Sequence, residues 1–471
     1  MNTIKKTLKR IAVIGGGDAG TRFINTIKES SLNKEFVFIG IFDDNKEKIG
    51  KKIAGVEVLD SILNINKYSD IFDEIVIALP SLSQKSFNGI YNKLIKTDKK
   101  ILTIPSLKNI LIQPESITSV RKINIKDLIN RKEMPINYQN ITKSVKDKTI
   151  LVTGGAGSIG SVIVELCLNG MAKKVICIDN SEYNTYLLTK RISDKRLFYK
   201  TADVKDKRVI DIYFDKYKPD IVFHAAALKH VNLQENDIKN CLLTNFFGTK
   251  NIIELSKEYN IKDFVLISTD KAVEPSNNMG LSKRLAELIV LNNSQSCNTK
   301  MSIVRFGNVI GSSGSVLNLF SELIKNKKDI IITHPKVARF FMSIEEACYL
   351  VLQSLKIREN NKHIFMIDMG EEILIKDIAE TLIKLNNLKP NQDIKIKFGK
   401  LKKGEKITEK LNYSFEKPIN TNIDKLISLD TNIDIKNFKN FEESLEKMIY
   451  NKNIDDKKIK LFIDEKLKNF L

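Results

Sequence analysis

Short runs of apolar residues alternate along this chain with longer segments whose apolar residues recur every three or four positions. The runs "RIAVI", "EFVFIGIF" and "EIVIAL" begin at residues 10, 35 and 74, and a glycine-rich turn follows the first of them. Such runs are typical of buried parallel strands, and the longer pattern is typical of the helices that cover them. The pattern therefore predicts a parallel α/β domain over about residues 8–122, within a domain that we assign to 1–122.

The same pattern returns at "KTILVTGGAGSIG", which begins at residue 148. Further strands are predicted at "KVICIDN", "DIVFHAAA", "DFVLISTD" and "MSIVRFGN". Alternating strands and helices predict a second parallel sheet with both faces covered. We therefore expect an α/β fold with two Rossmann-like, doubly wound parallel-sheet domains. The mixed pattern after Asn308 predicts that the second, catalytic domain has a smaller C-terminal substrate-binding portion.

Other segments connect and extend these domains. Residues 123–147 are polar, with one proline and little periodicity, which predicts a linker. We assign 148–420 to the second domain with its substrate-binding portion. The last residues, 421–471, are rich in Lys, Asn and Asp and are expected to form a C-terminal helical extension.

Composition narrows the classes of function. The hydrophobic content of 42% is that of a globular protein, and the formal net charge of +20 raises the question of nucleic-acid binding. The lysines are scattered and no nucleic-acid motif is present, so we expect no nucleic-acid partner. A phosphate-bearing substrate or attraction to anionic lipid is the alternative use of the charge. Five cysteines without a Cys-x-x-Cys pair, and only four histidines, predict buried thiols and no metal site.

The glycine-rich turn at 154–160 carries the strongest chemical signal. Gly154, Gly157 and Gly160 lie between a strand and a helix, where backbone N–H groups can approach a dinucleotide pyrophosphate. Asp179 ends the next strand, where an acid binds the adenosine ribose, and a carboxylate there favours NAD over NADP. Glycines also permit tight packing of a strand on a helix, which is the competing explanation.

Further positions complete the predicted cofactor site. Asp203 and Val204 follow the third strand, where adenine would lie, and the small side chains of Ala225 and Ala226 leave the backbone accessible. Asn245 is expected to tie backbone segments together nearby, and His224 is expected to be structural. The predicted cofactor-binding set is Gly154, Gly157, Ser158, Ile159, Gly160, Asp179, Asp203, Val204, Ala225, Ala226, Asn245 and Lys283.

The N-terminal domain has its own glycine turn. Gly15, Gly17 and Gly20 stand there, and Asp43 and Asp44 end the second strand. No catalytic segment follows. A regulatory nucleotide or sugar-nucleotide site and an empty fold used for assembly are both open.

Eight short segments, in order, resemble a known family. They are "TGGAGSIGS", "DNSEYN", "HAAALKHV", "ISTDKAV", "MGLSKR", "RFGNVIGSSGSV", "HPKVARFFM" and "KKGEK". From about Lys148 to Leu411 the chain resembles the nucleotide-sugar 4,6-dehydratases of the extended short-chain dehydrogenase/reductase superfamily. The closest likeness is the polysaccharide-biosynthesis branch that acts on UDP-N-acetylglucosamine, including the dehydratase type of bacterial bacillosamine synthesis. The N-terminal domain and the linker "DLINRKEMPIN" match the layout of that branch.

The resemblance implies an NAD-dependent, C5-retaining UDP-N-acetylglucosamine 4,6-dehydratase, a hydro-lyase with tightly bound cofactor. In the implied reaction NAD⁺ takes a hydride from sugar C4, the C5 proton is removed, the C6 hydroxyl leaves as water, and the hydride returns to C6. The implied product is UDP-2-acetamido-2,6-dideoxy-hexos-4-ulose, for bacterial polysaccharide or glycoprotein glycans.

The resemblance also assigns catalytic roles. Thr269 hydrogen-bonds the C4 oxygen, Asp270 acts as general acid on the departing C6 hydroxyl, and Lys271 is the base at C5. Lys283 holds the nicotinamide ribose. Met279 stands where related enzymes usually have tyrosine, and a methionine cannot carry a proton. Met279 is therefore expected to select the retaining dehydratase among the related reactions.

Substrate contacts are implied in later segments. Asn308, Ser312 and Ser313 are expected near the sugar diphosphate, and Arg339 suits a diphosphate because its donors form a planar fork. Lys402 and Glu405 are implied near the uridine, although the branch usually has arginine where Lys402 stands. The implied substrate-binding set is Lys229, Met279, Asn308, Ser312, Ser313, Arg339, Lys402 and Glu405.

Other functions stay open. A UDP-sugar 4-epimerase or a C5-inverting 4,6-dehydratase shares the fold and cofactor. From another class, a non-catalytic NAD-binding sensor or scaffold in envelope assembly would also use two Rossmann-like domains. We expect a UDP-N-acetyl-hexosamine as substrate and a homo-oligomer.

The sequence also bears on location. No apolar run approaches the roughly 20 residues that span a bilayer, which predicts a cytoplasmic protein, with the inner face of the membrane as the alternative. The family branch carries transmembrane helices ahead of its first nucleotide-binding domain. A naturally soluble form and membrane association through a missing N-terminal region are both open.

Overall fold

The chain forms two compact units, which are described separately. The computed structural model describes residues 8–82, 84–104, 121–123, 127, 133–294, 297–357, 363–386, 388–431, 433, 435, 437–468 and 470. The first unit contains residues 1–132, 320–330 and 377–397, and the second contains 133–319, 331–376 and 398–471. Of the segment expected as a linker, residues 124–126 and 128–132 lie outside the described residues. The domain boundaries inferred from the sequence stay predictions.

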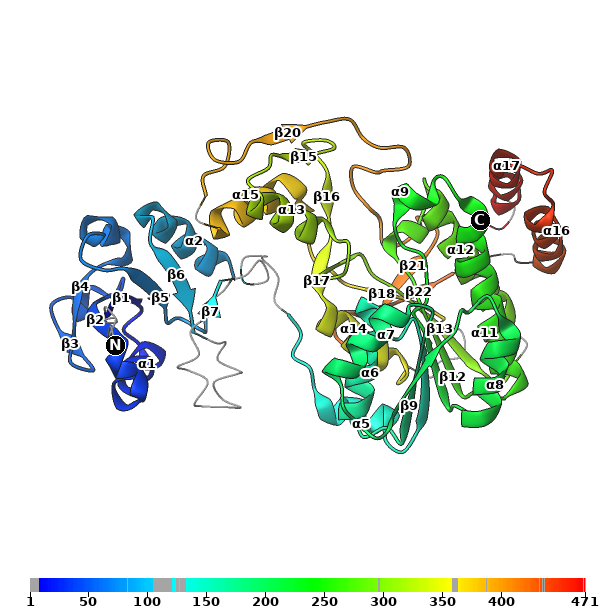
Figure 1. The fold of residues 1–471 in the computed structure, drawn as a ribbon, viewed down its shortest axis with the longest axis horizontal. Helices are drawn as coiled ribbons and strands as arrows, with labels where there is room; N and C mark the ends of the chain where they lie inside the picture. The colour runs from blue at the N-terminus through cyan, green and yellow to red at the C-terminus, as the bar shows by residue number, and fades with distance from the viewer. Residues whose placement is uncertain are drawn as a thin grey trace, which may run out of the picture. The chain divides into compact units, whose positions relative to one another are not determined.

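The N-terminal part of the first unit is a Rossmann-like sheet with the strand order β3-β4-β2-β1-β5-β6-β7 (Figure 1). Its elements are β1 (Lys9–Ile14), α1 (Asp18–Glu29), β2 (Phe36–Phe42), β3 (Lys52–Ile53), β4 (Val56–Asp60), β5 (Glu74–Ile77), α2 (Gln84–Leu94), β6 (Lys100–Thr103) and β7 (Arg121–Lys122). Successive residues of β1 enter different apolar clusters, Ile11 and Val13 one and Ala12 and Ile14 the other. This alternation means that both faces of the sheet are covered, as the continuous apolar run predicted.

The second unit is built on a nine-stranded sheet with the order β10-β9-β8-β11-β12-β13-β18-β22-β21. The strands are β8 (Thr149–Thr153), β9 (Lys174–Asp179), β10 (Leu197–Thr201), β11 (Ile221–His224), β12 (Asp263–Ile267), β13 (Lys300–Arg305), β18 (Ile364–Ile367), β21 (Lys417–Asn420) and β22 (Leu426–Asp430). The strands from β10 to β18 are parallel, whereas β22 pairs antiparallel with both β18 and β21. The expected α/β fold with Rossmann-like parallel sheets is confirmed.

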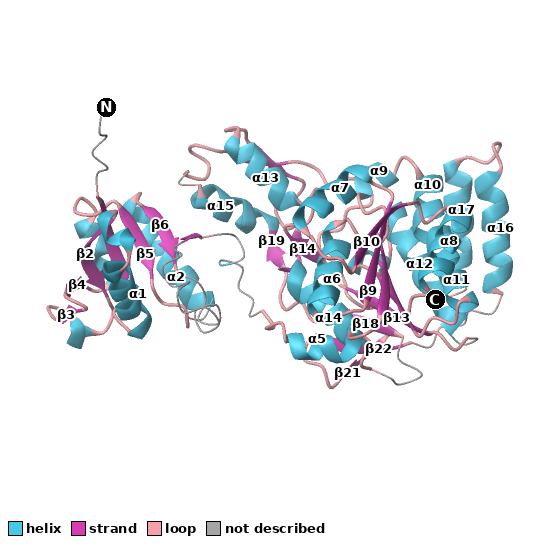
Figure 2. Ribbon diagram, turned by 60° about the horizontal axis from the view of Figure 1, so that its bottom comes forward, coloured by secondary structure: helices cyan, strands magenta, loops and turns pink. Residues whose placement is uncertain are grey.

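Helices cover both faces of this sheet, as Figures 1 and 2 show. On one face lie α5 (Tyr138–Val145), α6 (Ser158–Asn169), α7 (Glu182–Arg191) and α14 (Ile344–Ser354), which share an apolar cluster. The other cluster is formed by α8 (Lys207–Tyr217), α10 (Ile238–Leu242), α11 (Gly248–Glu258), α12 (Asn278–Ser294), α16 (Phe438–Tyr450) and α17 (Asp456–Leu467). The short helix α9 (Val231–Gln234) precedes α10.

The late segments form smaller elements. They are β14 (Asn308–Ile310), α13 (Val316–Lys325), β15 (Ile330–Ile332), β16 (Ala338–Arg339), β17 (Phe341–Ser343), β19 (Ile373–Leu374), α15 (Ile375–Leu385) and β20 (Ile396–Phe398). Within the second unit, β14 pairs with β17 and β16 pairs with β19. No helix in the described part of the chain is long and apolar enough to cross a membrane.

Two local findings refine the sequence pattern. The segment expected as a linker contains α5, whose Ile141 and Val145 are fully buried, although its polar composition gave little sign of a helix. The expected C-terminal helical extension contributes β22 to the central sheet before its two helices begin. In both cases tertiary packing overrides a weak local pattern.

The strand order places the candidate site residues. It reverses between β8 and β11, so the chain segments that leave these two strands diverge. In open α/β sheets the crevice at the carboxyl ends of strands at such a point binds the ligand. The glycine turn follows β8, and the segment 225–231 follows β11, so both lie at this crevice.

Candidate active site

The glycine turn after β8 is a tight strand-to-helix connection. Gly154 has φ +62°, and a Cβ there would lie 2.6 Å from the backbone nitrogen of Ala226; a Cβ on Gly160 would lie 2.1 Å from the carbonyl oxygen of Gly154. These two glycines are therefore required by backbone packing. Gly157 instead precedes α6, and no side chain caps the first turn of that helix. Packing thus explains Gly154 and Gly160, while the uncapped helix start is the feature suited to a phosphate.

Asp179, at the end of β9, braces this turn. Its carboxylate accepts hydrogen bonds from the backbone N–H groups of Ala156, at 3.0 Å, and Ser181, at 2.9 Å. The side chain is largely buried but lines a cavity. A carboxylate has about four acceptor positions, so two bonds to the backbone leave Asp179 able to accept hydroxyls of a ribose.

A cavity of about 220 Å³ lies between the glycine turn and the ends of β9, β10 and β11. The predicted residues that line it are Gly154, Gly157, Asp179, Asp203, Val204, Ala225 and Ala226. Small side chains, a buried acid and a helix N-terminus thus surround one space. These features fit the adenosine and phosphate part of NAD.

Asn245 holds the far wall of this cavity. Its side-chain oxygen accepts a hydrogen bond from the backbone N–H of Leu228 at 2.7 Å, and its nitrogen donates to the Leu228 carbonyl at 3.0 Å and to Ser282 at 2.9 Å. It lies in a π-helical turn, Leu243–Phe247, between α10 and α11. π-Helical turns are rare in proteins, and those that occur are often found at functional sites. Asn245 therefore fixes the backbone after β11, in the bracing position that the sequence analysis expected.

His224 lies behind the cavity and is fully buried. Its Nδ1 lies 2.6 Å from the hydroxyl of Thr153, and its Nε2 lies 2.9 Å from the hydroxyl of Thr249. Burial lowers the pKa of His224 to about 3, with a smaller effect from Lys283. The neutral ring therefore links β8, β11 and α11.

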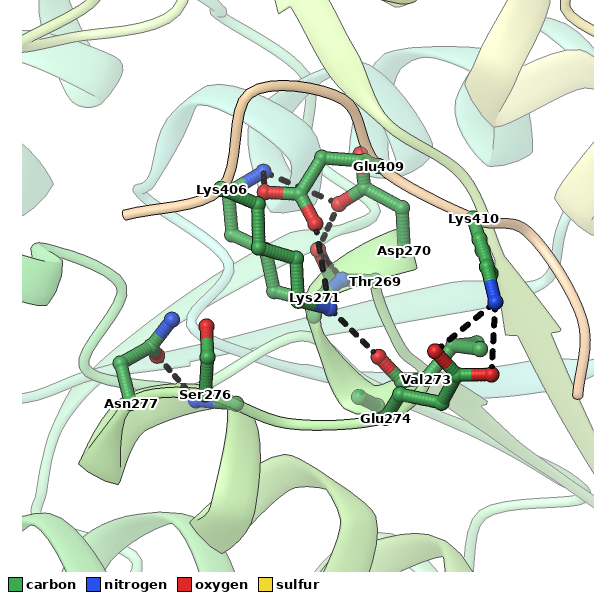
Figure 3. Close-up of polar contacts among 12 residues, drawn as sticks. Thr269, Asp270, Lys271, Val273, Glu274, Ser276, Asn277, Lys406, Glu409 and Lys410 are labelled. Carbon is green, nitrogen blue, oxygen red and sulfur yellow. Dashed lines mark hydrogen bonds and ion pairs between the residues drawn. The ribbon is translucent and has the colours of Figure 1, made fainter. Parts of the chain in front are cut away.

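Thr269, Asp270 and Lys271 follow β12 and contact one another (Figure 3). Oδ1 of Asp270 accepts hydrogen bonds from the Thr269 hydroxyl at 2.8 Å and from Nζ of Lys271 at 3.0 Å. The other oxygen, Oδ2, is buried and has no hydrogen-bond partner among the described residues. It faces Gly307, where a Cβ would lie 2.9 Å away. The triplet therefore presents one held carboxylate oxygen and one unpartnered oxygen.

Met279 and Lys283 lie one turn apart near the start of α12, and both are buried. Nζ of Lys283 donates to the carbonyl oxygen of Ile267 at 2.7 Å, which places it at the end of β12, beside the triplet. Burial lowers the pKa of Lys283 to about 8, although Glu287 and Cys241 oppose that shift. Its charge can therefore respond to small changes in its surroundings near neutral pH.

Several predicted substrate residues meet near the start of α6. The Ser158 hydroxyl donates to the Ser313 hydroxyl at 3.2 Å and accepts from the Ser313 backbone N–H at 3.0 Å. Nζ of Lys229 donates to the Ser313 carbonyl at 2.7 Å. Asn308 lies instead beside the triplet, where its side-chain oxygen accepts from Nζ of Lys271 at 3.3 Å.

Arg339 makes hydrogen bonds to the backbone and an ion pair with Glu405 at 3.8 Å. Its guanidinium donates to the carbonyl oxygens of Ala338, Ile407 and Lys406, at 2.7, 2.9 and 2.8 Å. Glu405 accepts from the Thr333 hydroxyl at 2.8 Å and from the Lys402 backbone N–H at 3.1 Å. In this structure Arg339 therefore fixes the segment around Lys406, and its contact with a diphosphate stays a prediction.

Sequence analysis missed two charged residues that adjoin the triplet. Oε1 of Glu409 lies 3.9 Å from Nζ of Lys271, and Oε2 lies 3.5 Å from Nζ of Lys406. The Glu409 side chain is almost fully buried. Lys406 ends the quoted "KKGEK" segment and Glu409 stands three residues after it, but local spacing gives no sign that this loop reaches β12.

A buried ion cluster supports the same region and was also missed. Arg305 and Glu287 pair at 2.7 Å, Arg305 and Glu416 at 2.7 Å, and Arg284 and Glu287 at 2.9 Å, with all four side chains fully buried. Burial would raise the pKa of Glu287, but Arg305 and Arg284 outweigh it and lower the pKa to about 2. The Ser268 hydroxyl donates to Glu287 at 2.6 Å, so the cluster directly adjoins the triplet.

The N-terminal glycine turn repeats part of this geometry. Gly16 donates its backbone N–H to Asp43 at 2.7 Å, as Ala156 does to Asp179, and a Cβ on Gly20 would lie 2.0 Å from the Gly15 carbonyl. There, however, Nζ of Lys48 also contacts the Asp43 carboxylate, at 3.1 Å. The repeat concerns backbone packing and leaves the ligand of this unit open.

Comparison with known proteins identifies the family. The sequence profile described as "Polysaccharide biosynthesis protein" matches residues 150–431. The probable polysaccharide biosynthesis protein EpsC of Bacillus subtilis is 35% identical over 410 residues, covering 85% of this chain and 68% of that protein. The UDP-N-acetylglucosamine 4,6-dehydratase (inverting) of Campylobacter jejuni serotype O:23/36 is 33% identical, covering 57% of this chain and 81% of that protein. The structure of DesIV, a dTDP-glucose 4,6-dehydratase from Streptomyces venezuelae with NAD bound, has a TM-score of 0.51 at 21% identity, covering 56% of this chain and 88% of that chain, and supports the fold alone.

Proposed function

Since the chain belongs to the polysaccharide biosynthesis protein family, we propose that it is an NAD-dependent UDP-N-acetylglucosamine 4,6-dehydratase that retains the configuration at C5. Its product would be UDP-2-acetamido-2,6-dideoxy-hexos-4-ulose, for a bacterial polysaccharide or glycoprotein glycan. The observation that carries the proposal is the geometry of Asp270. One of its oxygens is held by Thr269 and Lys271, and the other is buried without a partner among the described residues.

The cofactor proposal rests on the cavity after the glycine turn. Asp179 would accept the adenosine ribose hydroxyls, Gly157 would place the α6 N-terminus against the pyrophosphate, and Lys283 would hold the nicotinamide ribose. When bound, NAD supplies a hydride acceptor for C4 and the same hydride for C6. Because a carboxylate at position 179 repels a 2′-phosphate, NADP is the weaker candidate.

The triplet then has the proton chemistry to perform. The Thr269 hydroxyl would hydrogen-bond the C4 oxygen, and the unpartnered Oδ2 of Asp270 would give its proton to the departing C6 hydroxyl. Lys271, beside Asp270 and Asn308, would remove the C5 proton. A cationic Lys283 would favour charge development on the C4 oxygen.

The remaining substrate residues are proposed to hold the nucleotide part. Ser313 and Lys229 meet beside the start of α6, where the sugar diphosphate would gain the Lys229 cation and the Ser313 hydroxyl. Glu405 and Lys402 lie on the loop that also carries Glu409. Their proposed contact is with the uridine end.

The proposal that the enzyme retains the configuration at C5 rests on Met279. This buried side chain occupies the position one turn before Lys283 and offers no proton. The related epimerases and inverting dehydratases usually have tyrosine there, and the Campylobacter jejuni relative carries the inverting description. A proton return to the same face of C5 therefore depends on Lys271 alone.

The test is incubation of the purified protein with UDP-N-acetylglucosamine, with the sugar followed by NMR. A 6-deoxy methyl signal with the original C5 configuration is expected. The same methyl with inverted C5 identifies the inverting dehydratase, and a 4-epimer without the methyl identifies an epimerase. Binding of NAD and substrate without turnover would support a sensor or scaffold.

A further inference from the structure

Glu409 is a buried carboxylate beside the proposed base. It lies on the loop that follows the Arg339-held segment, whereas Lys271 lies on the turn after β12 (Figure 3). The distance from its Oε1 to Nζ of Lys271 is 3.9 Å. Its other oxygen lies 3.5 Å from Nζ of Lys406 and has no hydrogen-bond partner among the described residues. The carboxylate is therefore one small side-chain movement away from a direct bond to Lys271.

The contact between Glu409 and Lys271 is buried and lies among other charged groups. Burial raises the pKa of the Glu409 carboxyl above its usual range. The charged groups that act on this carboxyl are Lys271, Asp270, Lys406 and Arg339. The Glu372 carboxylate accepts the backbone N–H of Glu409 at 3.0 Å. Nζ of Lys406 is also bound to the carbonyl of Val273 at 2.8 Å, which holds it on the side of Glu409 away from Lys271.

A lysine that acts as a base must first lose a proton. Ammonium is the ordinary form of lysine at neutral pH, and Nζ of Lys271 lies 3.9 Å from the Glu409 carboxylate. An ammonium group cannot accept the C5 proton. The proton on Nζ therefore needs an acceptor that is not already required for another step, and Asp270 is required for the C6 hydroxyl.

We propose that Glu409 is that acceptor, and that it acts through Lys271 without contacting the sugar. This inference rests on the proposed dehydratase function. An N–H bond of Lys271 breaks and an O–H bond forms on Glu409, which leaves a neutral amine and a neutral carboxylic acid. The C5–H bond then breaks, its proton forms a new N–H bond on Lys271, and its electron pair stays on the sugar. When Lys271 returns that proton to C5, Glu409 returns its own proton to Lys271 and the pair is restored.

The test compares three variants with the wild-type enzyme. Glu409→Gln keeps the shape and removes the acceptor, Glu409→Asp restores a carboxyl, and Glu274→Gln is the matched control. Glu274 is exposed and pairs with Lys410 at 2.9 Å, close to the triplet in the chain but not facing Lys271. For each protein, kcat and KM are measured against pH, the reduced-cofactor absorbance is followed in a single turnover, and the melting temperature is recorded.

For Glu409→Gln we expect kcat to fall by about 100-fold at neutral pH, as for other general acid–base groups, with KM little changed. The activity should recover as pH rises, since hydroxide then deprotonates Lys271. Reduced cofactor should accumulate, because the oxidised sugar forms but cannot lose its C5 proton. Glu409→Asp should regain part of kcat, and Glu274→Gln should match the wild type.

Other results overturn the inference. The inference is wrong if Glu409→Gln has the kcat and the pH dependence of the wild type. It is also wrong if kcat falls but reduced cofactor does not accumulate and activity does not recover at high pH, because that result indicates a structural role. If Glu409→Gln does not fold, the pH profile of Glu409→Asp decides, and an unshifted profile overturns the inference. A wild-type enzyme that makes no 6-deoxy methyl product overturns the proposed function first and this step with it.

Discussion

Arg305 and Glu416 form two parallel hydrogen bonds, of 2.7 and 2.9 Å, in the fully buried interior of the second unit. Arg305 ends β13, and Glu416 immediately precedes β21. The Glu416 carboxylate also accepts the backbone N–H of Tyr413 at 2.8 Å, and the Tyr413 hydroxyl donates to the Ala272 carbonyl at 3.1 Å. This pair therefore connects the loop that carries Glu409 to the turn that carries Thr269, Asp270 and Lys271.

Replacing Glu416 should be costly. In Glu416→Gln the buried Arg305 keeps Glu287 but loses its second carboxylate, and breaking a buried pair typically costs about 3 kcal/mol. Urea unfolding should show this loss, and substrate turnover should fall with it. Glu443→Gln, at an exposed position of α16, is the control. Equal stability of the two variants would contradict the prediction.

Substitutions in the triplet should lower turnover without affecting cofactor binding. Asp270→Asn and Lys271→Ala should each lower kcat by about 10²- to 10⁴-fold, because each removes an acid or a base. Neither residue lines the cavity proposed for the adenosine part of NAD, so the cofactor content of the purified protein should stay at the wild-type level. Lys457→Ala, at an exposed position of α17, controls for the loss of a lysine. Loss of bound NAD would place these residues in the cofactor site instead.

Asp179 should set cofactor affinity and choice. Asp179→Ser removes the acceptor for the ribose hydroxyls and the brace on Ala156. Losing about 1.4 kcal/mol would weaken NAD binding about tenfold, and discrimination against NADP should decrease. Calorimetric titration of the cofactor-free protein measures both. The exposed Asp215→Asn should bind as the wild type does, and an unchanged NAD affinity in Asp179→Ser would refute the assignment.

Glycines in the second unit should differ sharply in how well they tolerate replacement by alanine. A Cβ on Gly160 would lie 2.1 Å from the Gly154 carbonyl, whereas one on the exposed Gly399 would meet nothing closer than 3.7 Å. Gly160→Ala should cost about 3 kcal/mol or prevent folding, since two backbone segments would have to separate. Gly399→Ala should be close to neutral. Melting temperatures of the two variants check the contrast.

His224 should make stability depend on pH. Its folded-state pKa, about 3, lies below its ordinary value of 6.5, so the unfolded chain takes up the proton first as pH falls. Its contribution is therefore fully present above about pH 6.5 and is lost progressively towards pH 3. Between about pH 7 and pH 5, above the range in which Glu287 titrates, urea unfolding should show that the free energy of unfolding depends less on pH in His224→Asn than in the wild type. The same change of unfolding free energy with pH in both proteins would contradict this prediction.

Much of the fold follows from local sequence. The apolar runs at 11–14 and 150–152 lie in β1 and β8, and a glycine turn follows each strand. The positions of Asp179, Ala225 and Ala226 around one cavity also follow, because β9 and β11 are parallel strands on either side of β8 and their carboxyl ends lie at one edge of the sheet. The helix α5 was not apparent, because its apolar residues Ile141 and Val145 stand in a polar segment.

Local sequence was enough to predict the main strands, the glycine turns and the adjacency of Thr269, Asp270 and Lys271, because each depends on residues close together in the chain. Only the folded structure shows that Glu409 lies beside Lys271, that Glu416 pairs with Arg305, and that Arg339 binds the backbone near Lys406. These contacts join segments far apart in sequence. Their geometry depends on how the late loops fold over β12 and β13, and no spacing of residue types encodes that path.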